Sequence, residues 1–293
     1  MKTGKGNGTL MIILAGLFWG SMGIFVRKLG EYGFTSVQIA AMRLFVAAVC
    51  FAVILWFKEP AGFRIRKKDI PLFLGLGLGS ILFFTICYFT AIQMMSMSVA
   101  AILLYTSPIW VMLMSILFLR EKMTMIKGIA LFLSFAGCVL VSGFQQGNMT
   151  VAGFLIGLGA GVGYGLYSIL GTVAMKRYSP YVVTTYTFII AAAGAIIICQ
   201  PADIVRKFCG VTNLAILLCF VLITGLVTAV IPFLLYTFGL QSVESGKAAI
   251  FATIEPLVAT LLGAVVFSEA VSLEAGIGIV CILAAVILLN RKC

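Results

Sequence analysis

The sequence predicts an all-α membrane protein of ten transmembrane helices, arranged as two inverted five-helix repeats around a central cavity. Three observations lead to this fold class: an apolar composition, ten long runs with few charges, and an internal repeat that relates the two halves of the chain. Of 293 residues, 62 % are hydrophobic and 10 % are charged, and the mean hydropathy is +1.20. A soluble globular domain could not bury so much apolar surface, so the chain is expected in a bilayer.

The long runs with few charges predict the transmembrane helices, because about 20 apolar residues cross the hydrocarbon as one helix. The runs lie at 9–29, 36–57, 70–92, 98–119, 125–143, 151–172, 180–200, 213–238, 245–267 and 272–289. Their connections are short, so we expect no appended soluble domain. The first run ends with Arg27 and Lys28 and lacks a small-residue cleavage site, which indicates a retained helix rather than a signal peptide.

The basic residues predict the orientation of the chain. Ten spans with both termini inside place fifteen Lys and Arg residues on the cytoplasmic side and four on the outer side. The cytoplasmic ones are Lys2, Lys5, Lys58, Arg64, Arg66, Lys67, Lys68, Arg120, Lys122, Lys127, Lys176, Arg177, Lys247, Arg291 and Lys292. The outer ones are Arg27, Lys28, Arg206 and Lys207. This bias follows the positive-inside rule, and it explains the net charge of +11 without a nucleic-acid partner.

Residue patterns for catalysis or metal binding are missing from the sequence. The chain has no His, and its eight Cys residues form no CxxC pair, so we interpret them as small apolar packing residues. No phosphate-binding Gly-Lys loop, HExxH motif, Asp pair or Ser–His arrangement occurs. The sequence therefore predicts no metal site, no cofactor and no enzyme activity.

An offset of 148 residues superimposes the second half of the chain on the first. It takes Tyr88 to Tyr236, Gln93 to Gln241, Pro108 to Pro256, Glu121 to Glu269 and Gly128 to Gly276. We place the two repeats at 9–143 and 151–289. Each repeat has five spans, an odd number, so the second enters the membrane upside down. Inverted repeats of this kind are typical of transporters, whose binding site lies between the halves near the midplane.

Features shared by both repeats are expected to be structural. Pro108 and Pro256 lack an N–H and free the carbonyls of Leu104 and Ala252, which kinks the helix for packing or for shaping the cavity. Each repeat also has a glutamate before a helix-capping residue, and a helix with closely spaced glycines. Glu121 and Glu269 precede Thr124 and Ser272, which we predict to cap the following helices, where a carboxylate favours the positive helix end. The glycines Gly153, Gly157, Gly161 and Gly165 are spaced for close helix packing.

Functional candidates lie where the two repeats differ, because a small substrate is not itself symmetric. Glu255 corresponds to Ser107, and Arg43 corresponds to Tyr186 or Thr187. Glu255 is expected roughly 13 Å, and Arg43 roughly 10 Å, from the end of its span at the helical rise. Ionisable groups at such depth are functional by default. Three roles remain open for them: binding a substrate, carrying a coupling proton, or neutralising each other.

Aromatic and polar side chains near the centres of the spans are candidates for lining the cavity, and packing is the alternative interpretation for each. They are Trp19, Ser21, Tyr88, Tyr105, Ser107, Pro108, Trp110, Tyr164, Tyr167, Tyr236 and Pro256. Lys247 follows Glu244 by three residues, a spacing that predicts an interfacial ion pair.

Several motifs resemble those of the EamA family, in the drug/metabolite transporter superfamily. They are Leu17-Phe18-Trp19-Gly20-Ser21, Ala100 through Ser107-Pro108 to Leu119-Arg120-Glu121-Lys122, Ile254-Glu255-Pro256 through Phe267-Ser268-Glu269, and Arg43 in the second span. The resemblance implies ten spans with the fifth and tenth peripheral. It also implies export, or less often uptake, of small metabolites such as amino acids across the bacterial inner membrane. Met22 departs from the family, because relatives often carry Asn there.

These observations favour a secondary transporter, an exporter of amino acids or similar small metabolites that works by alternating access. Its partners are then a small-molecule substrate and the lipid bilayer, and the sequence predicts no oligomeric state. An exchanger of phosphorylated sugars or nucleotide-sugars is an alternative, although it would require several cations within the membrane. A non-enzymatic channel or receptor is the remaining alternative.

Overall fold

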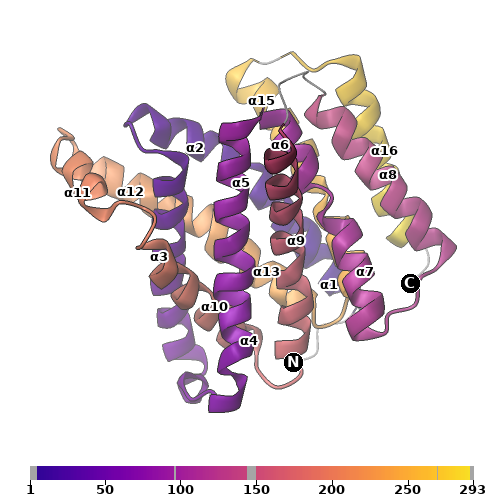
Figure 1. Ribbon diagram of the computed structural model, residues 1–293, viewed down its shortest axis with the longest axis horizontal. Coiled ribbons are helices and arrows are strands. Elements are labelled where there is room, and N and C mark those ends of the chain that lie inside the picture. The colour runs from indigo at the N-terminus through magenta and orange to yellow at the C-terminus, as the bar shows by residue number, and fades with distance from the viewer. Residues whose placement is uncertain (1–4, 96, 144–149, 269, 291–293) are drawn as a thin grey trace.

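The computed structural model describes residues 5–95, 97–143, 150–268 and 270–290, and these residues form helices with no strand among them (Figure 1). Glu269, Arg291 and Lys292 lie outside the described residues. The first half contains α1 (Lys5–Gly20), α2 (Met22–Glu31), α3 (Ser36–Lys58), α4 (Ile70–Leu74), the π-helical η3 (Gly75–Leu82), α5 (Phe83–Met94), α6 (Met97–Leu104), α7 (Ser107–Leu119) and α8 (Met125–Ser142). Two short 3₁₀ turns, η1 (Pro60–Phe63) and η2 (Lys67–Asp69), connect α3 to α4.

The second half repeats the order of the spans with two differences: α9 is continuous where α1 and α2 are separate, and one helix is added. It contains α9 (Val151–Ala174), α10 (Pro180–Ala195), α11 (Pro201–Cys209), α12 (Leu214–Gly225), the π-helical η4 (Leu226–Val230), α13 (Ile231–Gly239), α14 (Ser245–Ala252), α15 (Ile254–Phe267) and α16 (Leu273–Asn290). The addition is α11, which lies in a segment predicted to be a loop. Within the described residues, nine helical segments are long and apolar enough to span a membrane, and α10 is a shorter apolar helix at the seventh predicted position.

Three of the predicted spans are broken helices. The first is interrupted at Ser21, the fourth between Leu104 and Ser107, and the ninth at Thr253. The last two breaks have a clear cause, because Pro108 and Pro256 stand in the first turn of the following helix and donate no backbone hydrogen bond. The preceding helices end at the two residues whose carbonyls the prolines were predicted to free.

The first helix of each half packs against helices of the other half, as expected for two inverted copies of one unit. Helix α1 packs against α13 and α15, and its counterpart α9 packs against α5 and α7. Helices α3 and α10, the second of each half, lie against each other. Backbone details follow the same offset of 148 residues. Arg120 and Ser268 end α7 and α15 with left-handed φ angles of 58° and 55°, and the π-helical stretches end at Leu82 and Val230.

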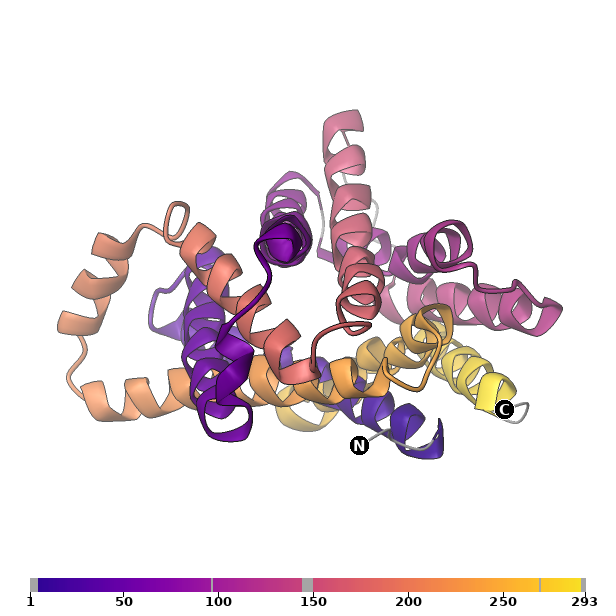
Figure 2. The ribbon, with the colours of Figure 1, turned by 90° about the horizontal axis from the view of Figure 1, so that it is seen from below.

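The fifth and tenth spans form a peripheral pair. Helices α8 and α16 run along each other at one edge of the bundle, while α11 lies at the opposite edge (Figures 1 and 2). The backbones of α8 and α16 approach closely, since a Cβ atom built on Gly137 would meet the carbonyl oxygen of Gly278 at 2.7 Å. The peripheral position agrees with what the family resemblance implied.

The helix caps match the sequence in part. Thr124 accepts a hydrogen bond from the N–H of Lys127, and Ser272 accepts one from Ala275, as predicted. The expectation for Glu121 was wrong in its target. Its carboxylate lies at the N-terminus of α14, in the other half of the chain, rather than at the helix that follows it. The tertiary packing brings α14 closer to this carboxylate than the start of α8.

Candidate functional site

The two membrane charges singled out by the sequence face the same region of the bundle. Arg43 lies two turns into α3, and Glu255 lies in the first turn of α15, directly after the break at Thr253. The carboxylate of Glu255 lies close enough to the guanidinium of Arg43 for the two opposite charges to attract each other. Both side chains are described, and no nitrogen of Arg43 lies within 4.0 Å of a carboxylate oxygen of Glu255. The two groups are therefore neighbours that do not form an ion pair.

Each charged group has weak or few hydrogen-bond partners. The hydroxyl of Tyr164 donates to Oε2 of Glu255 at 3.3 Å. Nη1 of Arg43 points to the sulfur of Met22, a poor acceptor, and Nε of Arg43 is buried without a partner among the described residues. A guanidinium has five N–H donors, so most of its hydrogen-bonding capacity is open. Both Arg43 and Glu255 are half-buried.

Tyr164 belongs to a cluster of aromatic rings from four helices. The Trp19 ring of α1 meets the ring of Tyr164 at a centroid distance of 6.1 Å, and Phe84 of α5 meets Tyr164 at 5.4 Å. Phe84 also stacks on Tyr88 at 5.9 Å. On the other side, Trp19 packs on Phe233 of α13 at 5.1 Å. These rings form an aromatic wall, which the Glu255 carboxylate contacts through the hydroxyl of Tyr164.

Tyr105 and Pro256 belong to the surroundings of Glu255 as well. The hydroxyls of Tyr88 and Tyr105 lie close enough to Glu255 to interact electrostatically with its carboxylate. Tyr105 and Pro256 share the lining of a small cavity of about 220 Å³, together with Thr260 of α15. The predicted candidates Trp19, Tyr88, Tyr105, Tyr164 and Pro256 thus gather around the carboxylate.

Other predicted candidates lie in helix packing. The hydroxyls of Tyr167 and Tyr236 are hydrogen-bonded to Thr237 at 2.6 Å and to Ser168 at 2.7 Å, and both rings are buried between α9 and α13. Ser107 and Pro108 are buried in α7, which packs on α9. The hydroxyl of Ser21 donates to the carbonyl of Phe18 at 2.7 Å within the turn between α1 and α2, and the indole of Trp110 donates to Thr106 at 3.1 Å.

Sequence reasoning missed three residues. Phe84 and Phe233 complete the aromatic wall, but a phenylalanine in an apolar span carries no signal that separates it from a packing residue. Thr187 of α10 has a buried hydroxyl without a partner among the described residues. In the repeat alignment, Tyr186 or Thr187 corresponds to Arg43. A threonine at that position signals only the absence of a charge.

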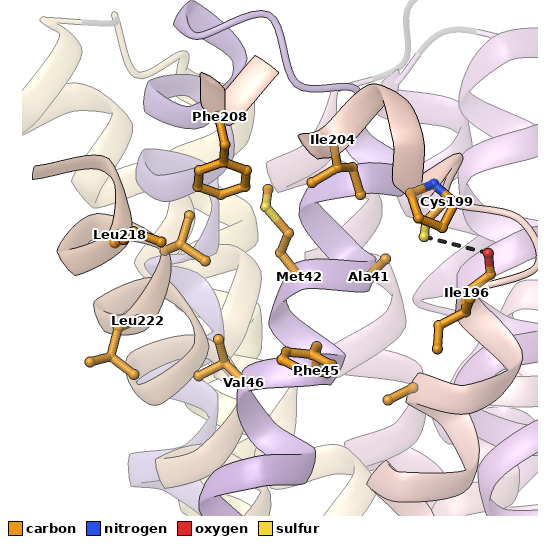
Figure 3. A pocket seen from close by; sticks show the side chains of 13 residues that line it. Ala41, Met42, Phe45, Val46, Ile196, Cys199, Ile204, Phe208, Leu218 and Leu222 are labelled. Carbon is orange, nitrogen blue, oxygen red and sulfur yellow. Dashed lines mark hydrogen bonds between the residues drawn. The ribbon is translucent and has the colours of Figure 1, made fainter. Parts of the chain in front are cut away.

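A larger pocket of about 540 Å³ has neither Arg43 nor Glu255 in its lining (Figure 3). Its walls come from α3, α10, α11 and α12 and include Met42, Phe45, Ile196, Ile204, Phe208 and Leu222. Every lining side chain is apolar, and Phe45 and Ile196 are 60 % and 55 % exposed. The pocket therefore opens sideways, toward the hydrocarbon that surrounds a membrane protein, and offers no group that would hold a polar solute.

Inverted repeats with unpaired charges between the halves define a membrane transporter rather than an enzyme. The model of the EamA-like transporter family matches residues 6–143 and 151–291. The chain belongs to the EamA-like transporter family, and the resemblance noted in its motifs is confirmed.

Curated relatives named as transporters match this chain over most of its length. An uncharacterized transporter of Archaeoglobus fulgidus is 30 % identical over 286 residues, which cover 97 % of each chain. The uncharacterized transporter YwfM of Bacillus subtilis is 26 % identical over 282 residues, covering 94 % of this chain and 91 % of the relative. A solved crystal structure superimposes with a TM-score of 0.81 over 98 % of this chain and 97 % of the other, at 18 % identity, which shows a shared fold.

Proposed function

We propose that the protein is a secondary transporter that exports amino acids or comparable small metabolites across the bacterial inner membrane by alternating access. The observation that carries this proposal is the arrangement of Arg43 and Glu255, two opposite charges that face one region of the bundle without pairing. Such charges are costly inside a membrane unless a partner neutralises them. A zwitterion would supply both missing partners at once.

The donors of Arg43 suit a carboxylate. A guanidinium can hold a carboxylate through two parallel hydrogen bonds, and Nε of Arg43 has no other partner among the described residues. Glu255 would hold the ammonium group of the substrate, or carry the proton whose movement drives transport. Tyr164 fixes the orientation of the Glu255 carboxylate from one side and leaves its second oxygen available.

The origin of the residues supports alternating access. Arg43 lies in the first half of the chain, whereas Glu255 and Tyr164 lie in the second. A substrate bound to both charges would bridge the halves, so its binding energy would depend on how the halves are placed. Differential binding of this kind is what allows a ligand to shift a conformational equilibrium.

The charge of the site also favours a substrate with a single carboxylate. Among the described residues around Glu255, Arg43 is the cation that faces the site. Lys247 lies in the first turn of α14, where it pairs with Glu244 at 3.8 Å. A phosphorylated sugar carries more negative charge than one guanidinium neutralises. The direction of transport rests on the family resemblance, and the cytoplasmic location of both termini rests on the bias of basic residues.

Three matched compounds test the proposal: an amino acid, the amine without its carboxylate, and the acid without its amino group. In proteoliposomes, we expect saturable transport of the amino acid and little competition from the amine or the acid. Arg43→Met should remove the preference for the carboxylate, and Glu255→Gln should remove the preference for the amine. Competition by all three compounds in the unmodified protein would contradict a two-charge site, and flux that does not saturate would indicate a channel.

A further inference from the structure

Polar contacts join the two halves at the end of the bundle where α1 begins and α7 ends. We call this end the termini end, because the first helix, α1, begins there (Figure 1). Asp69, before α4, accepts hydrogen bonds of 2.7 Å from Arg177 and from Tyr178, which follow α9. Glu59 accepts one from the hydroxyl of Ser179. In each contact the carboxylate comes from the first half and the donor from the second.

Glu121 makes a further contact of this kind, with backbone N–H groups of the second half. Its Oε1 accepts the backbone N–H of Ser245 at 2.8 Å, and its Oε2 accepts that of Gly246 at 3.2 Å. These are the first two N–H groups of α14, which have no partner within the helix, so the carboxylate caps a helix of the other half. Its side chain is only 10 % exposed, which strengthens a charge-assisted hydrogen bond.

The position of Glu121 is unfavourable for its own helix. It follows the C-terminus of α7, where the helix dipole repels a carboxylate. The chain turns here because Arg120 adopts a left-handed conformation, and this turn directs Glu121 across the interface. The buried ammonium of Lys127 forms ion pairs with carboxylates of both halves, at 3.9 Å from Glu121 and 2.9 Å from Glu244. The local cost is therefore offset by a contact that exists only when the two halves meet.

The capped helix leads directly to the proposed site. Helix α14 has eight residues and ends at Ala252, and Glu255 follows three residues later. The approach is tight, because a Cβ atom built on Gly246 would lie 2.9 Å from Sδ of Met112 and 3.3 Å from Oε2 of Glu121. Movement of α14 away from α7 would break the cap and displace the segment that carries Glu255.

We propose that Glu121 is a positioning residue for transport. Its cap on α14 holds the two halves together at the termini end, and the cap is released each time the site opens toward that end. This role rests on the alternating access of the proposed function. It differs from an ordinary helix cap, because it stabilises one arrangement of the two halves and not the other.

The test measures the alkylation rate of single cysteines by a small maleimide, without any substrate. Three reporters are placed in a background free of other cysteines. Ala248→Cys reports on α14, which Glu121 caps. Ala174→Cys lies one turn before Arg177 and Tyr178, at the contacts with Asp69, and does not touch Glu121. The native Cys138, buried in the α8–α16 pair, reports on general unfolding.

We expect Glu121→Gln to speed alkylation at positions 248 and 174 by roughly tenfold, since a charge-assisted bond becomes a neutral one, and to leave Cys138 unchanged. Gly246→Ala, which keeps the charge but crowds the cap, should act in the same way and serves if Glu121→Gln does not fold. Glu274→Gln, in the first turn of α16, is the matched control and should change nothing.

Three results would overturn the proposal. Faster alkylation at position 248 alone would show a local cap, faster alkylation at all three positions would show general destabilisation, and no change would show that the contact does not hold the halves. Because no substrate is used, a wrong assignment of Arg43 and Glu255 as an amino-acid site would leave these rates unaffected.

Discussion

The hydroxyl of Tyr164 donates a hydrogen bond of 3.3 Å to Glu255, and through this contact an aromatic wall orients a carboxylate inside the membrane. Both residues lie in the second half of the chain, 91 positions apart, on α9 and α15. Glu255 is therefore held on one side by its own repeat, while its other side faces Arg43 of the first repeat. The geometry separates a residue that positions the carboxylate from a residue that would share the substrate with it.

Tyr164→Phe should weaken substrate binding without weakening the fold. The ring contacts with Trp19 and Phe84 remain, and only the hydrogen bond to Glu255 is lost. A hydrogen bond to a charged group contributes about 1.5–3 kcal/mol, and at 3.3 Å we expect the low end, roughly a tenfold loss of affinity. Tyr167→Phe is the matched control, since it loses a bond to Thr237 within helix packing. It should lower thermal stability and leave affinity unchanged; the reverse pattern would contradict the site.

Arg43→Ala should reduce transport of carboxylate-bearing substrates by about 100-fold, the cost of leaving a desolvated charge without its partner. The transport rate of Arg43→Lys should fall between those of the unmodified protein and Arg43→Ala. Lysine keeps the charge, but an ammonium cannot hold a carboxylate through two parallel hydrogen bonds. Transport assays corrected for membrane abundance measure the effect. Lys28→Ala, which removes an exposed pair with Glu31, is the control. Unchanged transport by Arg43→Ala at normal abundance would exclude Arg43 as a substrate anchor.

Glu255→Gln separates the roles of the carboxylate. If Glu255 carries the coupling proton, substrate exchange persists and accumulation driven by a pH gradient disappears. If it holds an amine, binding itself weakens, because a charge-assisted contact becomes neutral. We expect one of these two results with normal thermal stability, since no ion pair joins Glu255 to Arg43 in the described residues. A loss of stability that Arg43→Met restores in the double variant would instead show mutual neutralisation.

The predicted topology is open to a labelling experiment. On a cysteine-free background, Arg64→Cys should react with an impermeant reagent from the cytoplasmic side and Arg206→Cys from the outer side. Both positions are exposed in the structure, so burial will not mask the result. Reaction of both positions from the same side would refute the ten-span orientation that the charge bias predicts.

The stability of the folded protein should depend on pH through the carboxyl group of Asp203 in α11. A hydrogen bond from Lys207, and further ones from Gln38 and Arg206, hold the pKa of this carboxyl well below its ordinary value. A lowered pKa in the folded state stabilises the protein above the unfolded pKa of about 3.9, and this contribution is lost as the pH falls toward the folded pKa. The difference in melting temperature between the unmodified protein and Asp203→Asn should therefore narrow between pH 7 and pH 3. A constant difference would contradict the prediction.

The amino-acid sequence by itself determined the membrane class, the approximate position of the spans and the repeat. Composition and run length suffice for the first two, because the bilayer imposes one helix length on every span. The repeat suffices for matching details such as the helix breaks, since Pro108 and Pro256 lack the same N–H wherever they stand. Arg43 and Glu255 were visible for a related reason: an ionisable group inside an apolar run is costly in any fold.

Only the tertiary structure decided which side chains meet. Tyr164 and Tyr167 are both tyrosines of one helix, yet one reaches Glu255 and the other is buried against α13, because a helix turns successive side chains toward different neighbours. Glu121 was expected to serve the helix that follows it in the chain and instead caps α14, more than a hundred residues away. Contacts of this kind depend on how helices of the two halves pack, and a hydrophobic pattern in the sequence carries no information about which partner each helix face will find.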